Sequence, residues 1–266
     1  MPDLWTHYFF AKEVMIENHL KDLDTSIYYF AAQGPDFLFY LDFYPWKKKD
    51  KEVDYSDLGS ILHNEKTNEV LQLVFSMLEN QNQALRSYLY GFLTHYALDS
   101  RVHPFVFFHA KDETQHKRLE MTIDVAMYKQ RRSKKITKED ALMIFDVGRE
   151  LPKEIIGFYQ HLALALFGRE IPAEILDRAY NDMKNFHRLT RANTLSKKLF
   201  LKTFNSFSKV PIDHYIYENE VDQRVLTQEM FEEFKENYDL AKVFFAKILE
   251  ERHTHNTLNF EGRFVD

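Results

Sequence analysis

The segment FLTHYALDSRVHPF, residues 92–105, places His95, Asp99 and His103 at intervals of four in a run that is otherwise typical of a buried helix. Residues four apart project from one helix face, one turn from each other. Imidazoles and carboxylates that share such a face can bind a divalent metal ion. The alternative is a hydrogen-bonded polar core, because single buried histidines often have neutral roles.

A second pair repeats this geometry in the segment HKRLE. His116 and Glu120 are again four residues apart, and Asp124 continues the same helical stripe. We expect Asp124 to accept a hydrogen bond from a ligand imidazole and so to orient it. Gly91 lies one turn before His95, and a glycine inside a helix costs about 1 kcal/mol relative to alanine. Another element should therefore approach the helix closely at Gly91.

Three more polar residues lie upstream in apolar surroundings. His7 belongs to the first expected helix, His63 follows two aliphatic residues in LGSILHNEK, and Asp36 lies at a Gly-Pro turn in GPDFLFY. A carboxylate among aromatic side chains needs a partner. The chain has no cysteine, and imidazoles with carboxylates suit catalytic zinc, iron or manganese rather than structural zinc. The candidate ligands are His7, Asp36, His63, His95, Asp99, His103, His116 and Glu120.

The remaining histidines lack a comparable context, and we interpret them as core or surface residues. One of them is His214, in PIDHYIY. The others are His19, His109, His161, His187, His253 and His255.

The elements that must position the candidate ligands are helices. Apolar residues recur at intervals of three and four, which is typical of amphipathic helices. Only seven Gly and seven Pro occur in 266 residues, which argues against an all-β protein with many tight turns. Pro104 is expected to end the long helix that carries His95. We predict helices over about 4–20, 22–32, 60–100 with a break near ENQNQ, and 114–129, then further helices separated at Gly168, Pro172 and SKVPIDHY.

The pattern predicts an all-α fold: a single multi-helix domain over residues 1–266, with a metal site between helices. The net charge of −6 provides no general attraction for nucleic acid or acidic membrane. No run of eighteen uncharged apolar residues is present, and the N-terminus lacks the features of a signal peptide. We therefore expect a cytoplasmic protein without stable membrane insertion.

Five segments resemble the motifs of the zinc-dependent phospholipase C family, which is related to the fungal single-strand-specific zinc nucleases. They occur in the family's order: MPDLWTHYFF, AAQGPDFLFY, ILHNEK, YGFLTHYALDSRVHPF and HKRLEMTID. The resemblance covers residues 1–128, and residues 129–266 match only as a helical continuation. It implies an all-α fold with a multinuclear zinc site. Carried over by motif, Asp36, His63, His95 and Asp99 would bind one zinc, His103, His116 and Glu120 a second, and His7 and the bridging Asp99 a third.

The resemblance implies hydrolysis of phosphate esters. Three zinc ions would outweigh the charge of the three carboxylates and attract a phosphate anion. Two close metal ions can hold the attacking and leaving oxygens, and one can activate a water molecule, with Asp36 as a candidate general base. A lipid or small-molecule phosphoester is the implied substrate. Iron or manganese would suit the same ligands.

Two other functions stay open. A nuclease or nucleotide phosphodiesterase would take nucleic acid as substrate only, and would need aromatic platforms for bases. A non-catalytic metal-binding helical protein would hold its metal in a closed shell of protein ligands. The aromatic residues that could supply the platforms are Phe37, Phe39, Tyr40, Tyr44 and Trp46.

The third zinc is where the chain departs from the family. In secreted members the amine and carbonyl of an N-terminal Trp, exposed by signal cleavage, complete that site. Here Trp5 stands only two residues before His7. The N-terminal amine of Met1 or Pro2 would have to take this role, so two or three zinc ions are expected.

Overall fold

Helices make up nearly all the regular structure of the residues that a computed structural model describes: 4–42, 55, 57–79, 82–132, 134–191, 194, 196, 197, 199, 201, 203, 215–252 and 258–264. The predicted all-α fold is confirmed; that residues 1–266 form one domain stays a prediction. In chain order the elements are α1 (Leu4–Glu17), α2 (Thr25–Ala31), the 3-10 helix η1 (Gly34–Tyr40), α3 (Leu58–Asn64), α4 (Thr67–Met77), α5 (Gln83–His109), α6 (Glu113–Arg131), the 3-10 helix η2 (Ile136–Lys138), α7 (Leu142–Phe145), α8 (Lys153–Phe167), α9 (Ala173–Thr190) and α11 (Gln228–Glu251).

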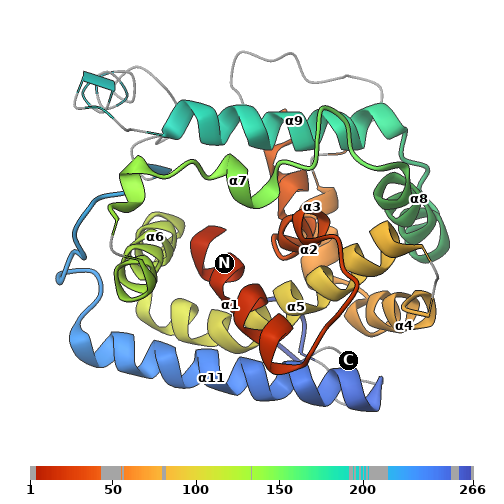
Figure 1. Cartoon of the computed structure of the whole chain (residues 1–266), viewed down its shortest axis with the longest axis horizontal. Coiled ribbons are helices and arrows are strands. Elements are labelled where there is room, and N and C mark those ends of the chain that lie inside the picture. The colour runs from red at the N-terminus through yellow and green to blue at the C-terminus, as the bar shows by residue number, and fades with distance from the viewer. Residues whose placement is uncertain are drawn as a thin grey trace.

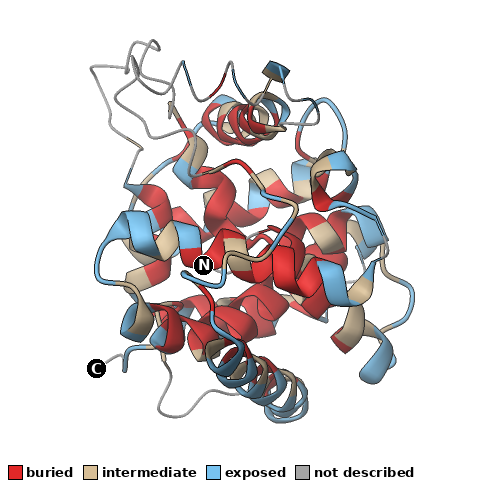
Figure 2. Ribbon diagram, turned by 90° about the vertical axis from the view of Figure 1, so that its left-hand side faces the viewer, coloured by how far each residue is buried: buried red, intermediate tan, exposed pale blue. Residues whose placement is uncertain are grey.

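Helix α5 is the centre of the arrangement. It contacts α1, α2, α6, α8, α11 and η1 (Figure 1). Every residue from 91 to 100 is buried, as expected of a helix that is surrounded by other elements. Figure 2 shows that buried residues gather on the central helices, whereas exposed residues lie on the outer faces. Polar side chains in this stretch of α5 therefore face protein rather than water.

Gly91 allows α2 to pack directly on α5. A Cβ atom at this position would lie 2.3 Å from the carbonyl oxygen of Tyr28 and 2.6 Å from Cβ of Ala31. No side chain fits within such distances of a backbone oxygen. The predicted close approach is thus confirmed, and its partner is the helix that leads into η1.

Pro104 does not end α5, contrary to the prediction. The helix continues to His109, although a proline inside a helix costs about 3 kcal/mol through a lost hydrogen bond and a steric clash. Pro104 itself is exposed, whereas Phe105 and Val106 are buried. Packing of the extended helix outweighs the local cost, and His103 therefore lies inside a helix rather than at its end.

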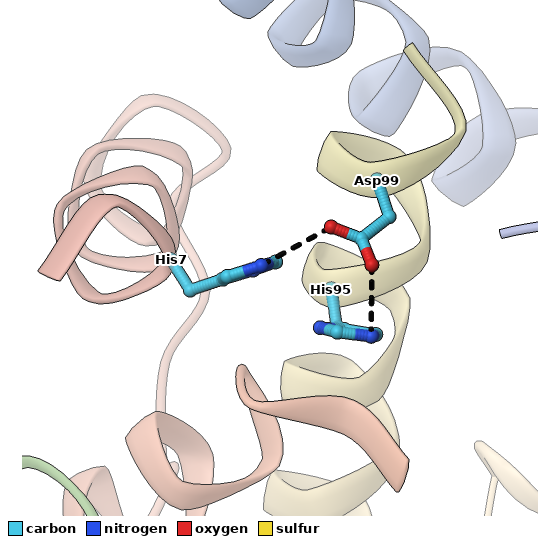
Figure 3. Close-up of side chains that lie close together, drawn as sticks. All are labelled: His7, His95 and Asp99. Atoms are coloured by element: carbon cyan, nitrogen blue, oxygen red, sulfur yellow. Dashed lines mark ion pairs between the residues drawn. The ribbon is translucent and has the colours of Figure 1, made fainter. Parts of the chain in front are cut away.

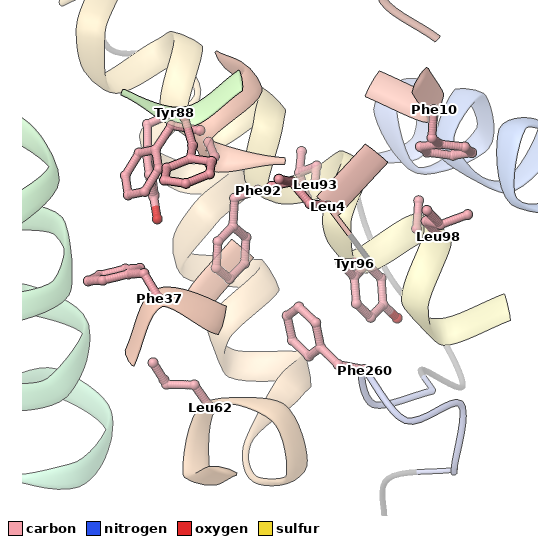
Figure 4. Packing of buried hydrophobic residues seen from close by; sticks show 14 of the residues in the cluster. Leu4, Phe10, Phe37, Leu62, Tyr88, Phe92, Leu93, Tyr96, Leu98 and Phe260 are labelled. Carbon is pink, nitrogen blue, oxygen red and sulfur yellow. The ribbon is translucent and has the colours of Figure 1, made fainter. Parts of the chain in front are cut away.

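The hydrophobic core joins distant parts of the chain around α5. Figure 4 shows Phe260, near the C-terminus, beside Phe92 and Tyr96 of α5, with Phe37 of η1 in the same region. Among the described residues, no helix is both long enough and apolar enough to cross a membrane.

Candidate metal centre

His7, His95 and Asp99 come together where α1 crosses α5 (Figure 3). The Nε2 atom of His7 lies 3.1 Å from Oδ1 of Asp99, and Nε2 of His95 lies 3.2 Å from Oδ2. The two imidazole rings stack with centroids 4.6 Å apart. One carboxylate therefore connects histidines from two helices.

Asp36 and His63 reach the same place from η1 and α3. Oδ1 of Asp36 lies 3.0 Å from Nε2 of His63 and 3.5 Å from Nε2 of His95. Gly34, with φ of +55°, makes this approach possible, because a Cβ atom there would lie 2.0 Å from Cδ2 of His95. We call His7, Asp36, His63, His95 and Asp99 the inner group.

His103, His116 and Glu120 form a second cluster between α5 and α6, which we call the outer group. Nε2 of His116 lies 2.7 Å from Oε1 of Glu120, one turn along α6. His103 and Glu120 are buried, whereas His116 is partly exposed. Within this cluster, ligand atoms from all three residues lie within 4.8 Å of one another.

The structure thus brings all eight predicted ligands into two neighbouring groups. The inner group contains two overlapping triplets, Asp36–His63–His95 and His7–His95–Asp99, whose ligand atoms each lie within 4.8 Å. His95 is common to both triplets, whereas the family motif made Asp99 the shared residue. Which residues bind which metal ion stays a prediction.

The inner group has the chemistry of a cation site. In the described part of the chain, eight of its buried polar atoms have no hydrogen-bond partner: His7 Nδ1 and Nε2, Asp36 Oδ1, His63 Nε2, His95 Nδ1 and Nε2, and Asp99 Oδ1 and Oδ2. Buried polar atoms are almost always hydrogen-bonded, and leaving them unpaired is costly. Divalent cations bound to these nitrogen and oxygen atoms would remove that cost. The donor set fits zinc.

Burial keeps three of the imidazoles neutral at physiological pH. It lowers the pKa of His95 to about 4 and the pKa of His116 to about 3, and it holds the pKa of His103 well below its ordinary value. A neutral imidazole has a lone pair to donate, and only that form binds a metal ion.

Neighbouring ionisable groups shift the pKa values of Asp99 and His63. Burial by itself would raise the pKa of the Asp99 carboxyl, but the neighbouring imidazoles, that of His95 first, hold this pKa well below its usual range. Burial acts to lower the pKa of His63, yet the neighbouring Asp36 carboxylate, 3.0 Å from Nε2, outweighs it and raises that pKa. Asp99 is therefore a carboxylate, and at His63 a metal ion has to compete with a proton for Nε2 more strongly than at an ordinary histidine.

Two backbone carbonyls orient imidazoles of the centre. Nδ1 of His63 donates to the carbonyl oxygen of Gly59 at 2.6 Å, and Nδ1 of His103 donates to the carbonyl oxygen of Phe260. Hydrogen bonds of this kind fix the tautomer and leave Nε2 available as a ligand. Phe260 could not be identified from the sequence, since nothing in its local sequence indicates proximity to a histidine 157 residues away.

Asp124 orients a helix rather than a histidine, contrary to the prediction. Its carboxylate accepts hydrogen bonds from the backbone N–H groups of Trp5 and Thr6, both at 2.8 Å, and from the Tyr217 hydroxyl at 2.7 Å. Free N–H groups at a helix N-terminus attract a carboxylate. Asp124 thereby anchors the start of α1, two residues before His7.

A platform for bases must be exposed and must lie near the candidate ligands. Of the aromatic residues considered for this role, Phe39 is the one among the described residues that meets both conditions. It is 40% exposed and its ring centroid lies 5.0 Å from that of His63. Phe37 is fully buried against Phe30 and Tyr159, and Tyr40 packs on Phe186 and His187. Met1, Pro2, Tyr44, Trp46, His214, His253 and His255 lie outside the described residues.

Comparison with known protein families gives a match that covers the candidate ligands. The model described as zinc dependent phospholipase C matches residues 6–163, more than half of the chain. This span contains both groups of candidate ligands. No curated protein and no solved structure matches the chain.

Proposed function

The chain belongs to the zinc dependent phospholipase C family, and we propose that it is a zinc-dependent hydrolase of phosphate esters that uses the inner and outer groups as ligands. The observation that carries this proposal is the set of buried nitrogen and oxygen atoms of the inner group that have no hydrogen-bond partner, on the same helix α5 that supplies His103 of the outer group. A chain that placed these groups only for stability would leave several kcal/mol of hydrogen bonding unrealised. Metal binding supplies the missing partners.

When bound, zinc ions would polarise the phosphoryl oxygen and lower the pKa of an attacking water. The protein's own residues would bind these ions and hold one another in position. His95, His103 and His116 donate as neutral imidazoles, and Asp99 holds His7 and His95 in place.

Asp36 is the residue that we assign as general base. Its side chain is 12% exposed, more than any other in the inner group, and its Oδ1 is shared between two imidazoles. A carboxylate at the edge of such a cluster can accept the proton of an incoming water while the neighbouring histidines hold it in position.

Two aromatic side chains beside the candidate ligands support a proposal for the substrate class. Phe39 beside His63 and Phe107 beside His103 and His116 are each about two-fifths exposed. Both groups thus have an apolar aromatic face next to them. We propose a phosphodiester with an apolar or aromatic substituent, phospholipid cleavage on the glycerol side of the phosphate being the leading case. The same rings could stack on nucleic-acid bases, which keeps a nuclease as second candidate.

The test is hydrolysis of three substrates by zinc-loaded protein: a chromogenic phosphodiester, phosphatidylcholine in mixed micelles, and single-stranded DNA. We expect turnover of the chromogenic ester and of the lipid, loss of both after chelation, and recovery with zinc. DNA cleavage without lipid cleavage would favour the nuclease. A protein that binds zinc and hydrolyses none of them would support the non-catalytic alternative.

The Asp36→Asn variant tests the role of Asp36 as general base. We expect its kcat to fall by about 10²- to 10⁴-fold, the typical contribution of a general base. The matched control is Asp182→Asn, which changes another buried carboxylate outside both groups. A variant with unchanged kcat would contradict the role assigned to Asp36.

A further inference from the structure

Residues 258–264, LNFEGRF, lie against the metal centre, although the family match ends at residue 163. Phe260 is fully buried, and its ring centroid lies 5.2 Å from that of His63 and 5.7 Å from that of His95. Figure 4 shows this ring inserted between α5 and α3 from the far end of the chain. A segment outside the matched region therefore forms one wall of the centre.

The backbone of Phe260 connects to both groups. Its N–H donates to the backbone carbonyl of His63 at 3.3 Å, and its own carbonyl oxygen accepts from Nδ1 of His103. The first contact ties the segment to α3 and the inner group. The second reaches the imidazole that α5 contributes to the outer group.

Hydrogen bonds hold the segment in place on both sides of Phe260. The side-chain oxygen of Asn259 accepts from the N–H groups of Glu261 and Arg263, at 3.0 and 2.9 Å, which closes a tight turn. The hydroxyl of Tyr96 donates to the carbonyl of Leu258 at 2.8 Å. These contacts fix the residues on both sides of Phe260.

Gly262 brings this turn onto α5. Its φ is +72°, and a Cβ atom there would lie 2.5 Å from Cγ of Pro104 and 2.8 Å from the carbonyl oxygen of Ser100. A larger residue would push the turn away from the helix. The exposed proline inside α5 is thus one surface on which the segment rests.

We propose that Phe260 is a positioning residue of the metal centre: its carbonyl holds His103 in the tautomer that carries its proton on Nδ1, and its ring supports His63 and His95. An imidazole with the proton on Nε2 would present an N–H group to the metal instead of a lone pair. Loss of such an orienting partner typically costs about 10- to 100-fold in metal affinity. The inference rests on the proposed zinc binding.

The experiment compares Gly262→Ala with Gly168→Ala. Both glycines have positive φ, but a Cβ atom at Gly168 would meet nothing within 4 Å, so the control has the backbone strain without displacing the turn. We expect Gly262→Ala to weaken the affinity for zinc of one site by about 10- to 100-fold in competition with a chelator. Gly168→Ala should bind zinc like the wild type.

The tautomer of His103 provides a second measurement. It would not change if Phe260 had only a structural role. In metal-free wild-type protein labelled with ¹⁵N, NMR should show His103 protonated on Nδ1, and in Gly262→Ala this preference should weaken. A wild-type His103 protonated on Nε2 would overturn the proposal, and this measurement decides even if the variant does not fold. Equal zinc affinity in both variants and wild type would also overturn it, while leaving the proposed function intact. A wild-type protein that binds no zinc would instead contradict the proposed function.

Discussion

The inner and outer groups use the same ligand types but are assembled in different ways. The inner group draws five residues from α1, η1, α3 and α5, and eight of its buried polar atoms have no hydrogen-bond partner in the described part of the chain. In the outer group, His116 and Glu120 come from one turn of α6, already paired, with His116 partly open to solvent. The first group exists only once the core has packed, whereas most of the second is a property of one helix. They should respond differently to mutation and to pH.

Asp99→Ala tests the inner group and should have the largest effect. Asp99 connects His7 to His95 and is fully buried. We expect zinc content to fall by at least one ion per chain and activity to fall by more than about a hundredfold, since even partners of ligands are worth 10- to 100-fold in affinity or activity. Elemental analysis of protein purified without added metal measures the first effect.

The control for this variant is again Asp182→Asn, which should keep its full zinc content. One metal or none in the wild type, unchanged by Asp99→Ala, would mean that the inner group is an unusual polar core.

Glu120→Gln tests the outer group and should have a smaller effect. The amide keeps the shape of the carboxylate but removes its charge, which weakens a zinc ligand. We expect the loss of one zinc ion while the inner group keeps its metal, and a fall in activity of at least about tenfold. Loss of all zinc in Glu120→Gln would show that the two groups bind metal as one unit and that the comparison is wrong.

Gly34→Ala tests how strongly the inner group depends on packing. The added Cβ atom would collide with the His95 ring at 2.0 Å, so overpacking should cost about 1–3 kcal/mol in the free energy of unfolding, beyond the strain of positive φ. Chemical denaturation of metal-free protein, with Gly168→Ala as the reference for that strain, measures the difference. Similar stabilities for the two variants would indicate that η1 can move away from α5 at little cost.

The pH dependence of zinc binding is the smallest expected effect, and it should separate the groups. Because the pKa of His63 is raised from its ordinary value, zinc must displace a proton from this imidazole once the pH falls below that raised pKa. Affinity of the inner group should therefore fall as the pH falls through that value, by about tenfold per unit for one proton. His103 and His116 have lowered pKa values, so the outer group should keep its zinc to lower pH.

Zinc titrations at pH 8 and pH 5.5 would measure this difference. Loss of both ions over the same pH range would contradict it.

Several features follow from local sequence alone. The intervals of three and four predict the helices, because the period of apolar residues is set by helix geometry. The same geometry places His95 with Asp99, and His116 with Glu120, since side chains four apart share a face whatever surrounds them. Gly91 indicates a close contact for a similar reason, because the absence of a side chain in a helix has a cost that only packing repays. The order of the motifs along the chain likewise indicates the family without any knowledge of the structure.

Tertiary structure decided the rest. That Asp36, His63 and His7 meet at His95, that Gly34 makes room for this meeting, and that Pro104 stays inside α5 all depend on contacts between separate elements. Asp124 shows the limit most clearly: its helical stripe was predicted correctly, but its partner is the start of α1. Phe260 is further still from anything that local sequence indicates. Helical periodicity fixes which side chains share a face, whereas the free energy of burying the whole core determines which faces meet.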